Sequence, residues 1–159
     1  MSAKNESAPS STLTREKLID LLNEDLSREY QAIIAYVNYS QVLKGAQYMN
    51  IARELQVHAG EELAHALLIA KQIDYLGGTP TVTPEPVKSS KDAKVMLEAD
   101  LQNELTTIAN YRARLRQAES LGEYAMSEVL REILIQEQDH AIDLAMALGI
   151  EVPPIPNID

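Results

Sequence analysis

The strongest constraint on this chain is a repeat of 75 positions among polar side chains that are costly to bury. Five residues of one predicted inward stripe recur as the same residue type 75 positions later: Asp25 and Asp100, Glu29 and Glu104, Tyr36 and Tyr111, Glu62 and Glu137, and His65 and His140. Carboxylates and imidazoles are rarely buried without partners. The repeat therefore predicts that each half of the chain brings one half of a symmetric polar site to a common centre.

The composition favours helices in a single domain. The chain has 159 residues, of which 45% are hydrophobic, yet it contains no Phe, no Trp and only seven Tyr. The core must therefore consist of Leu, Ile, Val, Ala and Met, and the length suits one domain. We expect residues 13–150 to form it, residues 1–12 to be a flexible polar tail, and residues 151–159 to be a short Pro-rich tail.

Apolar residues recur at helical spacing in four segments. The first helix is expected to begin at Thr14 as its N-cap, and the third at Ser89, which resembles a capping box with Asp92. Gly149 is expected to end the fourth helix. The four predicted helices span about residues 14–45, 46–76, 89–121 and 123–148.

The connections between these helices predict the topology. The links at Gly45 and Gly122 are so short that each joins two antiparallel helices. The middle link, residues 77–89, carries three prolines and reaches about 40 Å when extended, which is close to the length of a 30-residue helix. It can cross the whole molecule and start the third helix parallel to the second. We therefore expect an all-α four-helix bundle with one long crossover.

Charge and cysteine content exclude several classes of function. The formal net charge is −10, which argues against nucleic acid and is compatible with cations as ligands. Arg112, Arg114 and Arg116 are expected on a solvated face. Without cysteine, any metal must be held by oxygen and nitrogen. Apolar runs are too short for a signal peptide or a membrane span, so we expect a cytoplasmic protein with no membrane partner.

Two Glu-x-x-His motifs carry the candidate chemistry. Glu62 and His65 stand three residues apart in the second predicted helix, as do Glu137 and His140 in the fourth. Residues at this spacing lie on one face of a helix, so each pair can offer a carboxylate oxygen and an imidazole nitrogen to one point. A lone Glu-x-x-His is more often a local pair on a solvated face, so the motif needs further support.

That support comes from Glu29 and Glu104, each of which precedes its Glu-x-x-His by 33 residues. All four glutamates lie beside apolar residues at helical spacing, which predicts burial. Four carboxylates in a core repel one another and resist ionisation unless countercharge is supplied. Two divalent cations would supply four positive charges, and two neutral histidines would complete the ligand set. The sequence therefore predicts a two-metal site.

A Glu on each of two helices, with Glu-x-x-His on each of the other two, is the pattern of ferritin-like di-iron carboxylate proteins. The chain resembles that superfamily, and bacterioferritins most of all, from about Thr14 to Gly149. The resemblance implies that two glutamates bridge the metals and that the other ligands hold one iron each. The implied bridging pair is Glu62 with Glu137, and the two sets of terminal ligands are Glu29 with His65 and Glu104 with His140.

The remaining symmetric pairs are expected to surround the ligands. Tyr36 and Tyr111 lie two turns beyond the terminal glutamates, so each phenol can donate to the glutamate of the opposite helix, and we assign them a catalytic role. Asp25 and Asp100 are expected to accept a hydrogen bond from the non-ligating nitrogen of a histidine. The alternatives are core tyrosines with their hydroxyls at the surface and exposed aspartates.

Three features depart from the repeat or from the family. His58 has no counterpart, because position 133 is Ile, and we expect it on the surface or an inner wall and not as a ligand. Bacterioferritins bind haem through a methionine that follows the bridging glutamate of the second helix, but this chain has Leu63 there, so we expect no haem. Beyond Gly149 the short Pro-broken segment lacks the family's fifth helix, so we expect fewer than 24 subunits.

These patterns favour a di-iron ferroxidase that oxidises Fe²⁺ to Fe³⁺ with oxygen or peroxide, for iron storage and detoxification, in a homo-oligomer. Two iron ions per subunit are expected, with manganese as an alternative. One rival is a redox enzyme that keeps its metals, such as a rubrerythrin-like peroxidase or a manganese catalase. Another is a DNA-protecting assembly like the Dps proteins, although those usually place the metal site between subunits.

Overall fold

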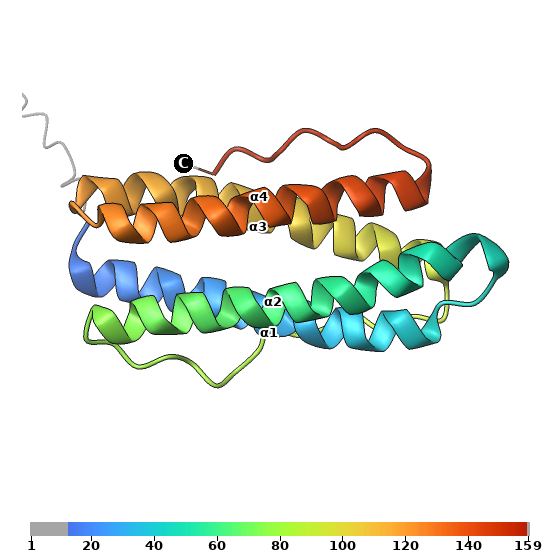
Figure 1. Cartoon of the computed structure of the whole chain (residues 1–159), viewed down its shortest axis with the longest axis horizontal. Coiled ribbons are helices and arrows are strands. Elements are labelled where there is room, and N and C mark those ends of the chain that lie inside the picture. The colour runs from blue at the N-terminus through green and yellow to red at the C-terminus, as the bar shows by residue number, and fades with distance from the viewer. Residues whose placement is uncertain (1–12, 159) are drawn as a thin grey trace, which may run out of the picture.

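The computed structural model describes residues 13–158, and in this range four long helices and one 3₁₀ turn form all of the regular structure. The elements are α1 (Arg15–Val42), η1 (Ala46–Tyr48), α2 (Met49–Tyr75), α3 (Ala93–Ser120) and α4 (Tyr124–Leu148). The predicted all-α four-helix bundle is confirmed (Figure 1). The tail expected at residues 1–12 lies outside the described part of the chain. Within that part, no helix is both long enough and apolar enough to span a membrane.

Two of the helix ends that the sequence predicted are confirmed, whereas the first helix ends earlier, at Val42, and the second and third begin later, at Met49 and Ala93. Thr14 caps α1, and Gly149, with a left-handed φ of 69°, ends α4 as predicted. The predicted start of the third helix at Ser89 was wrong. Asp92 is the N-cap of α3, because its carboxylate accepts a hydrogen bond from the backbone N–H of Val95 at 3.1 Å.

Residues 76–92 form the predicted crossover, which returns along the bundle so that α3 runs parallel to α2 (Figure 1). Side chains mostly four residues apart on one face of α1 hold this segment through its backbone carbonyl groups. The donors and their acceptors are Asn23 to Thr79 (3.1 Å), Ser27 to Thr83 (2.7 Å), Gln31 to Pro86 (2.6 Å) and Tyr39 to Lys88. The irregular crossover thus finds side-chain partners for carbonyls that have none in a helix or sheet.

A layer of buried polar residues divides the apolar core into two clusters. One cluster includes Tyr36, Leu55 and Leu144, and the other includes Leu22 and Tyr111. In each of α1, α2 and α4, one end of the helix packs in the first cluster and the other end packs in the second. The predicted metal-site residues lie between these two ends. An apolar layer would serve stability better at this depth, so the polar layer indicates a function.

Candidate metal centre

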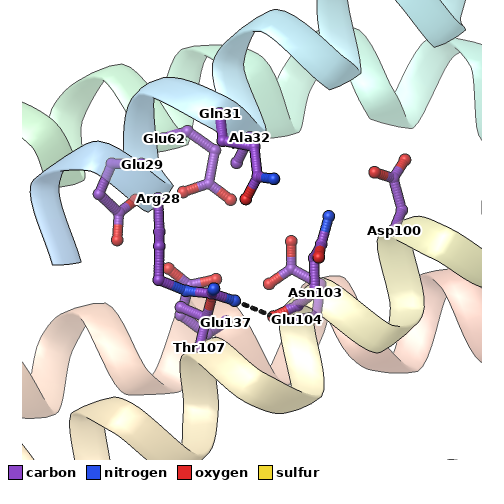
Figure 2. A pocket seen from close by; sticks show the side chains of 10 residues that line it. All are labelled: Arg28, Glu29, Gln31, Ala32, Glu62, Asp100, Asn103, Glu104, Thr107 and Glu137. Atoms are coloured by element: carbon purple, nitrogen blue, oxygen red, sulfur yellow. Dashed lines mark hydrogen bonds between the residues drawn. The ribbon is translucent and has the colours of Figure 1, made fainter. Parts of the chain in front are cut away.

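All four helices contribute to the polar layer, and every predicted ligand is at most 3% exposed. The contributors are Glu29 from α1, Glu62 and His65 from α2, Glu104 from α3, and Glu137 and His140 from α4. The four glutamates line one small cavity of about 10 Å³ (Figure 2). The structure therefore brings together all six predicted ligands.

The ligating atoms form two groups, and within each group they all lie within 4.8 Å of one another. Ligands about 2.0–2.2 Å from a common ion lie up to about 4.4 Å apart, so each group can close on one ion with small movements. Both groups contain Glu62 and Glu137, as a bridged pair of ions requires. The first group adds Glu29 and His65, and the second adds Glu104 and His140.

Several of these atoms are buried without a hydrogen-bond partner. Native proteins rarely leave such groups unpaired, and these are lone pairs that a cation would accept. Carboxylate oxygens with imidazole nitrogens suit iron or manganese, so the donor set fits two such ions. The carboxylate oxygens without a well-directed hydrogen bond are Oε2 of Glu29, Oε1 of Glu62, Oε2 of Glu104 and both oxygens of Glu137. Some of them lie close to an imidazole nitrogen, as Oε1 of Glu62 does at 2.9 Å from Nδ1 of His140.

Protons balance the charge of the metal-free centre. Burial, followed by the charges of Glu62 and Glu137, raises the pKa of Glu29 well above its usual range. Burial alone would lower the pKa of His140, but contacts with Glu137 and Glu62 outweigh it and raise the pKa to about 12. The pKa of His65 rises for the same kind of reason. Both imidazoles therefore hold the proton that a metal must displace.

Metal binding should consequently release protons. At pH 7.5 a solvated histidine is already neutral and would release almost none. Here we expect two Co²⁺ ions to displace at least two protons per chain. The apparent affinity for each ion should therefore weaken by about tenfold when the pH is lowered by one unit. The colour change of a pH indicator in weakly buffered protein measures the release. Binding of two ions with no proton release would contradict the raised histidine pKa values.

The two tyrosines make the hydrogen bonds that their spacing predicted. The hydroxyl of Tyr36 donates to Oε1 of Glu104, and that of Tyr111 donates to Oε1 of Glu29, in each case across the antiparallel pair α1 and α3. Burial, followed by the nearby carboxylates, raises the pKa of both phenols well above their usual range, so both stay protonated donors. Their catalytic role stays a prediction.

The predicted role of Asp25 and Asp100 beside the histidines was wrong. Asp25 instead accepts two hydrogen bonds from the buried Arg114, at 2.6 Å from Nε and 3.0 Å from Nη2. A buried carboxylate needs a countercharge, and a guanidinium supplies it with matched geometry. Arg114 therefore lies in the core, 4% exposed, and not on the solvated face that we expected. Oδ2 of Asp100 is buried without a hydrogen-bond partner.

Two residues that the sequence analysis missed hold the histidines. Nε2 of His65 lies 2.6 Å from Oε1 of Gln136, and Nε2 of His140 lies 2.8 Å from Oε2 of Glu61. These acceptors directly precede the shared glutamates and are themselves 75 positions apart. Their residue types differ, so a search for identical pairs passes over them. An acceptor at Nε2 would direct the lone pair of Nδ1 toward a metal ion once the proton on Nδ1 has left.

Removing the acceptor at Gln136 should weaken one ligand group. We expect Gln136→Ala to lower the affinity for one of the two Co²⁺ ions of this centre by about 10-fold or more, because the His65 ring loses the contact that fixes its orientation. Equilibrium dialysis under nitrogen measures the affinities. Gln138→Ala, at an exposed position of the same helix, is the control. Equal affinities in the two variants would show that Gln136 does not orient the ligand.

The four-helix fold and the buried cluster of carboxylates and histidines are those of a ferritin-like protein. The chain belongs to the ferritin-like domain family, whose match covers residues 19–149. Bacterioferritin from Brucella melitensis is 28% identical over 142 residues, which cover 85% of this chain and 88% of that protein.

Two solved structures are also similar. A ferritin-like diiron-carboxylate protein from Bacillus anthracis is 35% identical with a TM-score of 0.81, and the match covers 84% of this chain and 96% of that one. A dodecameric thioferritin, the bacterioferritin-related protein from Bacteroides fragilis, is 28% identical with a TM-score of 0.79 and coverage of 86% and 87%. The predicted ferritin-like di-iron resemblance is confirmed.

Proposed function

We propose that the protein is a ferroxidase that oxidises Fe²⁺ to Fe³⁺ at this centre. The observation that carries the proposal is the pair of ligand groups that share the buried Glu62 and Glu137. Each Fe²⁺ substrate ion gives up one electron. Two electrons reduce dioxygen to hydrogen peroxide, or hydrogen peroxide to water, with protons taken from the solvent or the site.

The protein's own groups prepare the site for this reaction. His65 and His140 accept or release the proton on Nδ1 as iron leaves or enters. Tyr36 and Tyr111 keep one oxygen of each terminal glutamate occupied, which leaves the other oxygen for a cation. The shell of apolar side chains on both sides excludes bulk water from the buried carboxylates.

Arg28 closes the side of the cavity between α1 and α3. Its Nη2 atom donates to the backbone carbonyl of Asn103 at 3.2 Å and lies 3.4 Å from Oγ1 of Thr107 (Figure 2). The guanidinium therefore ties the two helices together beside the glutamates. It repels cations, so this side suits the small oxidant, and we propose that Fe²⁺ enters elsewhere.

Replacing a shared glutamate should abolish the activity. We expect Glu137→Ala to lower the initial rate of Fe²⁺ oxidation by about 100-fold or more, because both ions lose a ligand at once. Stopped-flow absorbance after mixing with Fe²⁺ and oxygen measures it. Glu132→Ala, exposed on the same helix, should keep the wild-type rate. A wild-type rate in Glu137→Ala would remove the di-iron assignment.

Storage of the oxidised iron needs a closed protein shell, so we propose that the protein forms a homo-oligomer. We propose that this oligomer is cytoplasmic, has fewer than 24 subunits and binds no haem. Leu63, 53% exposed on α2, has no lone pair to offer a haem iron. We expect native mass spectrometry to give a multiple of the 17.6 kDa chain below 24, and the absorption spectrum to lack a Soret band. A 24-subunit mass or a Soret band would contradict this part of the proposal.

A further inference from the structure

A second cluster of metal-ligating side chains lies between α2 and α4, outside the six residues of the centre. His58 is buried at 2% exposure, and its Nε2 atom lies 3.1 Å from Oδ2 of Asp143. Ligating atoms of Glu54, His58 and Asp143 all lie within 4.8 Å of one another. Nε2 is therefore the nitrogen that an ion beside Asp143 would meet, and Nδ1, on the other edge of the ring, is buried without a hydrogen-bond partner. His58 was expected on the surface or an inner wall, but its side chain is buried against Asp143 of α4.

A surface pocket opens onto the two carboxylates of the cluster. It has a volume of about 270 Å³, and Glu54 and Asp143 line it together with Gln47, Asn50 and Met146. Glu54 is exposed, and the side chain of Asp143 is 38% exposed. Both carboxylates are therefore accessible to an ion from solvent, while the imidazole lies behind them in the protein.

The cluster also continues inward to the metal centre. The ring of His58 stacks on that of His140 with centroids 4.1 Å apart and an interplanar angle of 27°. Ligating atoms of His58, Glu61 and His140 form another group within 4.8 Å. Groups that can bind a cation therefore follow one another from the pocket to a ligand of the centre.

The charges around the cluster favour a cation. Among the described residues, neither Glu54 nor Asp143 forms an ion pair with a lysine or arginine. A purely structural His58–Asp143 hydrogen bond between α2 and α4 would need neither the adjacent Glu54 nor an open pocket. Two carboxylates and one imidazole with water in the remaining positions suit a divalent first-row ion.

We propose that Glu54, His58 and Asp143 form a third divalent-cation site, which takes up Fe²⁺ from the pocket and passes it toward His140. The delivery role rests on the proposed ferroxidase function, whereas binding of an ion at the cluster does not. This route approaches the centre between α2 and α4, away from the cation-repelling Arg28 between α1 and α3.

Counting bound Co²⁺ tests the site. By equilibrium dialysis under nitrogen we expect three ions per wild-type chain and two in Glu54→Gln or Asp143→Asn. Both variants change exposed or half-exposed groups and keep their shape, so the fold is retained. Glu132→Gln and Asp74→Asn, at exposed positions of α4 and α2, are the matched controls and should bind three. Two ions in wild type, or three in Asp143→Asn, would overturn the proposal.

A further variant separates this inference from the proposed function. Glu137→Ala disrupts the centre but leaves the cluster, so we expect it to retain one Co²⁺ that is lost on adding Asp143→Asn. That result supports the third site even if Glu137→Ala oxidises iron normally and the ferroxidase proposal fails. No difference between Glu137→Ala and the double variant would overturn the third site alone.

Delivery is tested with iron itself. At two Fe²⁺ per chain, the amount oxidised by Asp143→Asn should equal that of wild type. At a large excess of Fe²⁺ the centre must refill repeatedly. Under this condition we expect Asp143→Asn to oxidise Fe²⁺ several-fold more slowly than wild type, and Asp74→Asn to oxidise it at the wild-type rate. Equal rates at excess iron would overturn the delivery role.

Discussion

The burial of four carboxylates in the middle of a small apolar core is the constraint on which the structure depends. Each carboxylate would strongly favour water, so the helices can close only if positive charge enters with them. In the metal-free chain the protons on His65 and His140 provide part of that charge. Two divalent ions would take their place. The affinity of the centre for metal is thus linked to pH through the groups that hold it.

The near-symmetry of the two halves is broken at places that alter the electrostatics. Asp25 is neutralised by Arg114, but the position equivalent to Arg114 in the first half is Tyr39, whose hydroxyl donates to the crossover. Asp100 therefore keeps an unpartnered oxygen. Burial raises the pKa of both aspartates, but Arg114 opposes the rise at Asp25, whereas the charge of Glu62 adds to it at Asp100. The two proposed metal positions consequently lie in different electrostatic fields, although the residue types around them are the same.

The meeting of the six candidate ligands and the bundle topology could be predicted from the sequence because both follow from periodicity. Residue types that are costly to bury, repeated at a fixed offset on helical stripes, can only meet at a shared centre. The partners of those residues could not be predicted in the same way. Arg114 was expected in solvent because charge patterns alone do not reveal a buried carboxylate across the helix interface. Gln136 and Glu61 were missed because they occupy equivalent positions in the two halves but are different residue types.

The crossover, which hydrogen-bonds to α1, allows the two halves of the site to differ from each other. Two identical helical hairpins could meet about a two-fold axis and build the same centre, but every change would then appear twice. With residues 76–92 joining the hairpins in one chain, the partner is always present at high effective concentration, and each half can change alone. His58, whose equivalent position in the second half is Ile133, is one such difference, and it places an additional imidazole on only one side of the centre.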